Sequence, residues 1–171
     1  RKDALYFAAA RNFLRYRWLL IYLFGSSPNA DPTYNPVVDR ELEVIEARCP
    51  GCSGISERYG QHATSLRVSR YGYANAFLES GGVSFNSRRE YIASFRRLLG
   101  TELAMESEWY SPIRLKTEAA KGESQLSAME RSGVKYMEVR VIDLDPYERI
   151  GISLERLDFL HLFLLFCAIA D

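Results

Sequence analysis

The segment 135–144 constrains the fold of this chain most, because apolar and polar side chains alternate along it for the length of a β-strand. The two-residue period of a strand places Met137, Val139 and Val141 on one face. Asp145-Pro146, a pair typical of turns, follows directly. The sequence therefore predicts a strand over 135–144 with one face in the core, and a chain reversal after it.

The opposite face of this strand carries Tyr136, Glu138 and Arg140. A carboxylate and a guanidinium two residues apart lie roughly 7 Å from each other along a strand. At that spacing Glu138 can hold a hard cation while Arg140 contacts an adjacent phosphate oxygen. The spacing is equally compatible with a solvated sheet face that carries an ion pair, so it does not identify a site.

Helical patterns surround this strand. Apolar residues recur with helical spacing from Asp3 to Phe24, and Gly25 ends the pattern. Ser87 and Glu90 form a capping box that opens a helix reaching Gly100. Further helices are expected at 123–131, ending at Gly133, and after the cap residue Ser153, and the 108–116 segment, interrupted by Pro112, is expected at a sheet edge or bulge.

Helices and strands are interspersed without a regular βαβ rhythm, which favours an α+β fold with an antiparallel sheet. The segment 65–69 alternates like a second strand and places Arg67 opposite Leu66 and Val68. The segment 29–61 is rich in Pro, Gly and Ser, and we expect a surface loop or insertion there. The whole chain, 1–171, is expected to form a single, partial catalytic domain.

The most apolar part of the chain, 159–170, predicts a buried helix, because a membrane span needs about 20 residues. Leu157, Leu160, Leu164 and Ala168 are its expected inward residues, and His161 is expected to be partly buried. A shorter apolar run, 18–24, predicts a second core helix.

The composition excludes some classes of partner. The chain has 171 residues, of which 22 are basic and 22 acidic, so its net charge is zero. No overall field attracts nucleic acid or an anionic membrane, and we expect small-molecule partners. The first residues contain no initiator Met and no secretory leader, which suggests a piece of a longer chain. Three cysteines are few and odd in number, which favours a cytoplasmic setting.

Two short motifs have several interpretations. Cys49 and Cys52 have the spacing of half a zinc site or of a redox pair, and they are also compatible with plain loop thiols. Asp143 and Asp145 form a pair that binds metal in some proteins, but next to Pro146 a local turn role is favoured.

Four segments together resemble the glutamate–cysteine ligase family. They are the helix and loop at 11–28, the strand-like segments at 63–73 and 108–116, and the strand and turn at 137–146 with Ile150-Gly151 after it. They occur in the family's order and span most of the chain.

The resemblance implies an activity and a fold. The family uses ATP to phosphorylate the γ-carboxylate of L-glutamate, and the amine of L-cysteine then attacks the acyl phosphate to give γ-glutamylcysteine, the first step of glutathione biosynthesis. The implied fold is that of glutamine synthetase-like carboxylate–amine ligases, whose antiparallel sheet forms a half-barrel with flanking helices. Mg²⁺ accompanies the ATP and offsets the crowded phosphate charge.

The resemblance also assigns residues. Glu138 is expected to be a catalytic magnesium ligand, and Arg140 a catalytic clamp on the phosphates. Arg67 is expected to bind a carboxylate of glutamate, with ordinary strand exposure as the alternative. Tyr73 and Tyr110 are expected to line the cysteine pocket or, alternatively, to be core aromatics. Arg114 and Lys116 are expected either to contact the nucleotide or to be plain surface charges.

Some positions depart from the family pattern. Arg70 stands where the family usually has Asp, which reverses the charge near Arg67. Leu115 replaces a Pro, Val141 a Ser and Asp145 an Asn. The Arg70 change puts the substrate pocket most in doubt.

The family's other metal ligands are expected in segments upstream of residue 1, so we expect the 171-residue piece alone to be inactive. Two alternatives remain open. Besides a ligase, the parent protein could be the ligase half of a bifunctional glutathione synthase, or a non-catalytic paralogue with a binding or regulatory role.

Overall fold

The computed structural model describes residues 2–26, 47–48, 65, 68 and 82–170. The elements in this part of the chain are α1 (Lys2–Tyr16), α2 (Trp18–Phe24), α5 (Arg88–Leu98), the 3₁₀ turn η2 (Glu106–Glu108), β1 (Ile113–Lys116), α6 (Gln125–Ser132), β2 (Tyr136–Val139) and α7 (Leu154–Ile169).

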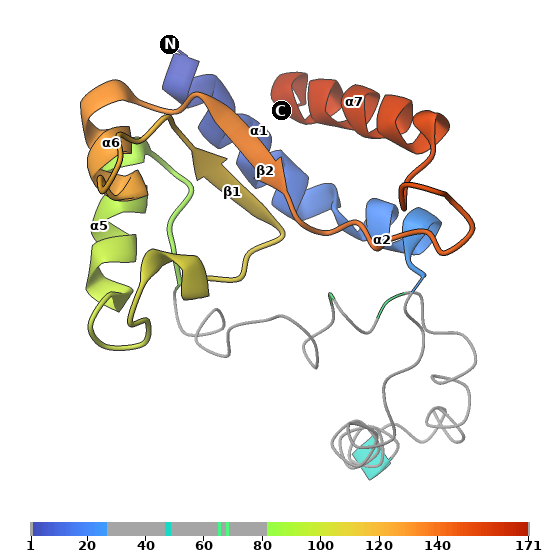
Figure 1. Ribbon diagram of the computed structural model, residues 1–171, viewed down its shortest axis with the longest axis horizontal. Helices are drawn as coiled ribbons and strands as arrows, with labels where there is room; N and C mark the ends of the chain where they lie inside the picture. Colours follow the sequence, from blue (N-terminus) through green and yellow to red (C-terminus); the bar gives the residue numbers. More distant parts are fainter. Residues whose placement is uncertain (1, 27–46, 49–64, 66–67, 69–81, 171) are drawn as a thin grey trace.

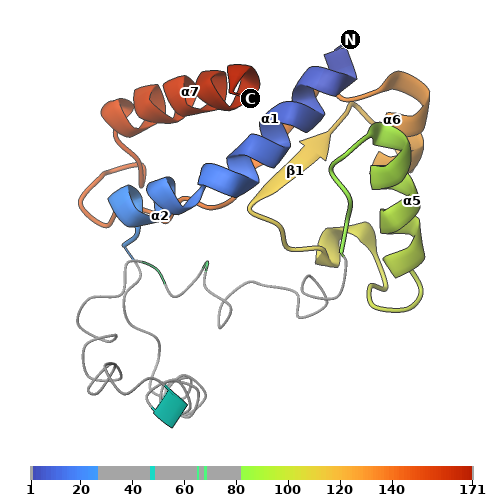
Figure 2. The same ribbon diagram turned by 180° about the vertical axis from the view of Figure 1, so that it is seen from behind.

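The strands β1 and β2 form an antiparallel pair in which Ile113 faces Val139 and Leu115 faces Met137. Helix α1 covers one face of this pair, as the two opposite views show (Figures 1 and 2). Ile113 and Leu115 are buried, while Met137 and Val139 are partly buried and pack against the core. The predicted apolar face of the 135–144 segment is therefore confirmed, as is the coarse class of helices with an antiparallel strand pair.

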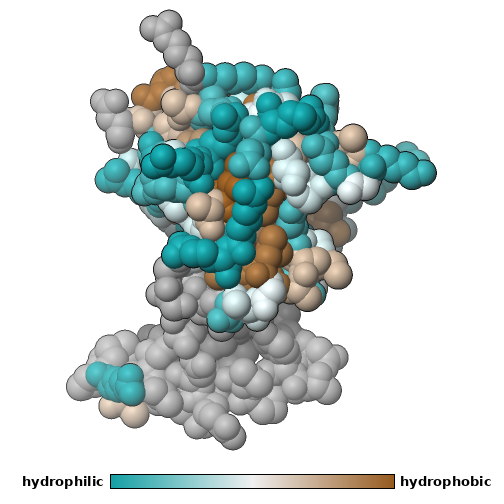
Figure 3. All heavy atoms as spheres, turned by 90° about the vertical axis from the view of Figure 1, so that its left-hand side faces the viewer, coloured by the Kyte–Doolittle hydropathy of each residue, from teal (hydrophilic) through white to brown (hydrophobic). Residues whose placement is uncertain are grey.

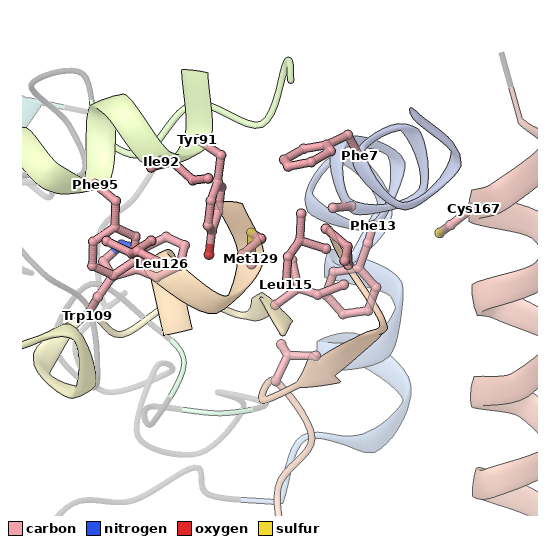
Figure 4. Close-up of a cluster of buried hydrophobic side chains, with 14 of the residues drawn as sticks. Phe7, Phe13, Tyr91, Ile92, Phe95, Trp109, Leu115, Leu126, Met129 and Cys167 are labelled. Atoms are coloured by element: carbon pink, nitrogen blue, oxygen red, sulfur yellow. The ribbon is translucent and has the colours of Figure 1, made fainter. Parts of the chain in front are cut away.

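The core lies between α1, the strands, α5 and α6 (Figure 4). Its aromatic part is centred on Trp109, whose ring centre lies 5.0 Å from that of Phe95 and 5.9 Å from that of Tyr91. Edge-to-face geometry of this kind adds to the free energy gained by burial. The residues that α1 and α6 contribute include Phe7, Phe13, Leu126 and Met129.

The serine caps predicted from the sequence are confirmed. Ser87 accepts a hydrogen bond from the amide of Glu90, and Ser153 accepts one from the amide of Arg156. The helix expected at 123–131 begins one residue after its cap, Ser124, and Gly133 follows its end with a φ of +72°. A left-handed φ at this position favours glycine.

The single helix predicted over 3–24 is interrupted at Arg17, which separates α1 from α2. The guanidinium of Arg17 donates to the carbonyl of Leu14. The backbone keeps helical partners on both sides of this turn, because the amide of Arg17 donates to the carbonyl of Phe13 and that of Ile21 to the carbonyl of Arg17. The predicted end at Gly25 is correct.

The strand predicted over 135–144 is too long, since β2 ends at Val139. The amide of Arg140 still donates to the carbonyl of Pro112 at 2.9 Å. Pro112 has no amide hydrogen to return a bond, and β1 begins only after it, which ends the ladder. The strand expected over 108–116 is shortened for the same reason.

Side chains from the helices form hydrogen bonds with backbone groups along the edge of β1 that faces away from β2. The hydroxyl of Tyr91 is hydrogen-bonded to the backbone of Leu115, and the side-chain oxygen of Gln125 accepts the amide of Thr117 at 3.1 Å. These bonds occupy backbone groups that a further strand would need. Burial raises the pKa of Tyr91, which keeps this hydroxyl neutral.

Helix α7 is much more exposed than its sequence predicts. Only Phe163 and Cys167 are buried in it. The ring of Phe163 packs against Phe13 of α1, and Cys167 points toward α1 (Figure 4). Of the expected inward residues, Leu160 and Leu164 pack against the core, but Leu157 is 41% exposed. His161, expected to be partly buried, is exposed. Trp18 and Tyr22 of α2 are likewise exposed, although a core helix was expected there. No helix in the described part of the chain is long and apolar enough to cross a membrane.

Several predictions fall on residues outside the described part of the chain. They include the strand at 65–69 apart from Ser65 and Val68, the loop at 29–61 apart from residues 47–48, the substrate residues Arg67 and Tyr73, Arg70, and the pair Cys49 and Cys52.

Candidate functional site

The strand register brings four of the predicted site residues onto one face of the β1–β2 pair. Arg114 lies directly opposite Glu138, and Lys116 lies two residues further along β1 on the same side. Arg140 follows the end of β2 with the same two-residue period. This face is opposite the apolar face that α1 covers, so the alternation predicted from sequence places these charges together.

Glu138 lies between two cations. Its Oε1 is 3.6 Å from Nε of Arg140, and its Oε2 is 3.9 Å from Nζ of Lys116. The Glu138 side chain is 40% exposed. These separations are those of loose ion pairs at a surface, which contribute little to stability. The carboxylate therefore stays accessible to a further ligand.

Arg140 is held beside Tyr110. The centre of its guanidinium lies 5.5 Å from the centre of the Tyr110 ring, within the range of a cation–π contact. The hydrogen bond from the amide of Arg140 to the carbonyl of Pro112 holds the backbone of Arg140 close to the segment that carries Tyr110. Two residues from separate motifs, predicted to contact phosphate and cysteine respectively, are thus neighbours.

Arg114 is the least accessible of these cations, with only 8% of its surface exposed. It donates to the carbonyl of Ser107 at 3.1 Å, and its guanidinium lies 5.9 Å from the centre of the Trp109 ring. Burial, followed by repulsion from Arg140, lowers the pKa of Arg114, while Glu138 raises it. An arginine nevertheless remains charged at any physiological pH.

A pocket of about 290 Å³ lies beside this face. Arg114 and Lys116 line it together with Trp109, Glu106 and the first turn of α6. The indole nitrogen of Trp109 and Nε of Arg114 are buried and have no hydrogen-bond partner among the described residues. Sequence patterns did not identify Trp109 or Glu106 as lining residues of a pocket, because neither belongs to a spacing that indicates binding.

The described side chains do not form a complete metal site. Within the described ranges, no group of three acidic, histidine or cysteine side chains could hold an ion. Glu138 supplies one carboxylate, and its near neighbours Lys116 and Arg140 are cations. Mg²⁺ is commonly held by one or two carboxylates together with substrate phosphates and water. Glu138 fits one place in such a set.

Ser26, at the end of the first helical segment, is tied to the chain that follows β2. The amide of Ser26 donates to Oδ2 of Asp143 at 3.0 Å, and its hydroxyl donates to the carbonyl of Leu144 at 2.8 Å. Asp145 accepts the amide of Tyr147 and pairs with Arg156 at 2.6 Å. The Asp145 bonds agree with the predicted local turn role, whereas Asp143 instead makes a long-range contact to Ser26.

Comparison with known proteins identifies the family. The sequence model of the glutamate–cysteine ligase family matches residues 1–104 and 95–171, which together cover the chain. A curated glutamate–cysteine ligase of Clostridium acetobutylicum is 44% identical over 96% of this chain. Another, from Saccharophagus degradans, is 36% identical over 99% of it.

Two solved structures resemble this fold, each with a TM-score of 0.72 over 99% of the chain. One is a bifunctional glutathione synthetase from Pasteurella multocida, 34% identical, and the other is a glutamate–cysteine ligase from Francisella tularensis in complex with AMP, 27% identical. The chain spans 39% and 35% of the two curated relatives, and 19% and 36% of the two solved chains. The polar face of β1–β2 is therefore part of a protein that belongs to the glutamate–cysteine ligase family.

Proposed function

We propose that this chain forms part of an ATP-dependent ligase that joins the γ-carboxylate of L-glutamate to the amine of L-cysteine. The observation that carries the proposal is the clustering of Arg114, Lys116, Glu138 and Arg140 on one accessible face of the β1–β2 pair. Family membership gives this cluster a chemical context. The relative from Francisella tularensis, solved with AMP, supports a nucleotide as the ligand.

The reaction has two steps. A γ-carboxylate oxygen of glutamate attacks the γ-phosphorus of ATP, the bond to the bridging oxygen breaks, and ADP leaves. The cysteine amine then attacks the acyl carbon, phosphate leaves, and the amine loses a proton. Negative charge accumulates on the transferred phosphoryl group in the first step, so cations must be fixed around it beforehand.

The described side chains meet part of that requirement. Arg140 presents a planar fork that can donate two hydrogen bonds to one phosphate, and Lys116 adds a point charge. Glu138 separates the two cations and would hold one Mg²⁺, which when bound offsets phosphate charge. Arg114 is too buried to move freely, so we assign it to orienting the pocket wall, and we assign nucleotide contact to the part of its side chain that lines the pocket.

Substrate selection is assigned to aromatic and basic residues of neighbouring motifs. Tyr110 lies against Arg140, and in the proposal its ring and hydroxyl border the cysteine pocket together with Tyr73. Arg67 would bind a carboxylate of glutamate. Placing Tyr110 beside the phosphate clamp is chemically reasonable, because cysteine must attack the carbon that carries the phosphate.

The proposal extends to the architecture. The two antiparallel strands would belong to a larger half-barrel sheet of the glutamine synthetase type, and residues 1–171 to one incomplete catalytic domain with a surface loop at 29–61. The low cysteine count favours a cytoplasmic enzyme.

A second candidate is the ligase half of a bifunctional enzyme. It is favoured by the 34% identity to the bifunctional glutathione synthetase of Pasteurella multocida, of which this chain spans 19%. Both candidates assign the same chemistry to the β1–β2 face.

The test uses a chimera in which this chain replaces the matching stretch of the Clostridium acetobutylicum relative. We expect equal amounts of ADP and γ-glutamylcysteine, formed only when glutamate, cysteine, ATP and Mg²⁺ are all present. The chain alone should form neither. A folded chimera that releases no ADP would contradict the proposal, as would activity of the isolated chain.

A further inference from the structure

The outward side of α7 is apolar although it faces solvent. Five large aliphatic side chains of this helix are exposed: Leu154 at 74%, Leu157 at 41%, Leu162 at 66%, Leu165 at 52% and Ile169 at 81%. On a helix these positions lie away from Phe163 and Cys167, which are buried against α1. We call these five residues the outer face of α7.

A helix that is apolar on all sides is normally buried on all sides. Here only one side is covered. Asn12 of α1 donates to the carbonyls of Cys167 and Ala170, and the ring of Phe24 lies 5.3 Å from that of Phe159. Helix α7 therefore packs antiparallel to α1 and α2, as the ribbon views show (Figures 1 and 2). The side of α7 that faces away from α1 remains exposed.

The opposite end of the molecule has an ordinary surface. The view onto α5 and α6 is mostly hydrophilic, with only a narrow apolar strip showing (Figure 3). Exposed arginine and glutamate pairs such as Arg96–Glu130 and Arg131–Glu123 belong to these helices and the turn before α6. Exposed apolar side chains therefore gather at the α7 end of the described part of the chain, where Trp18 and Tyr22 of α2 are exposed as well. Such a surface is of the kind that marks an interface.

We infer that the outer face of α7 is the docking surface for the part of the ligase polypeptide that this chain does not contain. The relatives are more than twice as long as the chain, which spans 39% and 35% of them. That leaves ample polypeptide to cover one helix. The inference rests on the proposed function only in taking the partner to be the remainder of a ligase.

Charge favours this occupant over a lipid surface. Helices that lie on a membrane are rich in Lys and Arg on their polar face. The exposed ionisable residues of α7 are instead Glu155, Asp158 and His161. The partner segment should be mainly apolar, with a donor or cation opposite Asp158.

The experiment measures the accessibility of a single introduced cysteine. In a background with Cys49 and Cys52 changed to serine, Leu165→Cys is compared with Met105→Cys, a matched control that is 57% exposed and lies outside α7. Maleimide labelling rates are measured in the isolated chain and in the chimera with the Clostridium acetobutylicum relative. Cys167 is buried and adds only a slow background.

We expect the chimera to slow labelling at Leu165→Cys at least tenfold and to leave Met105→Cys within twofold. Equal labelling of Leu165→Cys in the isolated chain and in a cooperatively unfolding chimera would overturn the inference. Labelling of the isolated chain that slows with its own concentration would instead assign the face to a second copy. Protection only by vesicles of phosphatidylglycerol and phosphatidylcholine would assign it to lipid.

Two further measurements separate this inference from the proposed function. If the chimera does not fold, the remainder of the relative is supplied as a separate polypeptide, and protection of Leu165→Cys is measured on mixing; no protection in this format overturns the inference. A chimera that protects Leu165→Cys but releases no ADP contradicts the proposed function and leaves the docking surface intact. The double variant Leu162→Glu/Leu165→Glu should weaken association at least tenfold.

Discussion

Nζ of Lys116 lies 3.9 Å from Oε2 of Glu138, across the antiparallel pair of β1 and β2. Arg140 approaches the other oxygen of the same carboxylate at 3.6 Å. Neither separation is a tight hydrogen bond, so the carboxylate can exchange either cation for a metal ion at small cost. The predictions for catalysis follow from this arrangement.

Replacing Lys116 should weaken nucleotide use selectively. In the active chimera, Lys116→Met should raise KM for ATP about tenfold, the size of one lost charge-assisted hydrogen bond. KM for cysteine should change less than twofold. Lys121→Met, which removes an exposed lysine from the turn before α6, is the control. A similar KM for ATP in the two variants would show that Lys116 is only a surface charge.

Tyr110→Phe should change KM for cysteine but not KM for glutamate. The variant keeps the ring that lies 5.5 Å from the Arg140 guanidinium but removes the hydroxyl. We expect KM for cysteine to rise about tenfold, as for one lost hydrogen bond, with KM for glutamate unchanged. Tyr22→Phe, at an exposed tyrosine of α2, should have no effect. Equal changes in both KM values would argue against a cysteine pocket at Tyr110.

Asp3 should be a stability residue with no catalytic role. One of its carboxylate oxygens accepts the amide of the buried Val134 at 3.0 Å, and the other pairs with Arg88 at 3.0 Å. Asp3→Ala leaves that buried amide unsatisfied, which should lower the free energy of unfolding by about 1–2 kcal/mol. Urea unfolding of the isolated chain measures it, with Glu102→Ala, at an exposed acid, as the control. Equal midpoints for the two variants would exclude this role.

Cys167 should make stability depend on alkaline pH. Burial raises the pKa of its thiol to about 11, whereas an unfolded chain's thiol titrates at about 8.5. Because the unfolded state ionises first, the contribution of Cys167 is complete below about pH 8.5 and declines as pH rises toward 11. The difference in free energy of unfolding between the wild type and Cys167→Ala should shrink over this range. A difference that is constant with pH would contradict the burial of the thiol.

Local patterns predicted the caps and the polar face well. Ser87 and Ser153 cap helices because a serine before a helical pattern accepts the amide three residues on, a geometry confined to neighbouring residues. Glu138 and Arg140 share a face because a strand has a fixed two-residue period. Family resemblance indicated the chemistry of that face, which the spacing alone did not.

Features set by tertiary contacts were predicted less well. Periodicity could not identify the buried side of α7, because leucine and phenylalanine occupy nine of its 16 positions and lie on all sides of it. Only contact with α1 selects Phe163 and Cys167. The length of β2 depends on Pro112 in a different segment, which ends the partner strand. The pocket beside Arg114 is formed by α6 and Trp109, which are separated from each other in sequence.

The central claim is that Glu138 lies at the phosphates of the ligase reaction. The most direct measurement is kcat for ADP release by the chimera with Glu138→Gln, at saturating glutamate, cysteine, ATP and Mg²⁺. Glu130→Gln, an exposed acid of α6 paired with Arg96, is the matched control. We predict a loss of about 100-fold or more for Glu138→Gln, the size seen for groups that stabilise charge in a transition state. A kcat within about twofold of the Glu130→Gln value would contradict the claim.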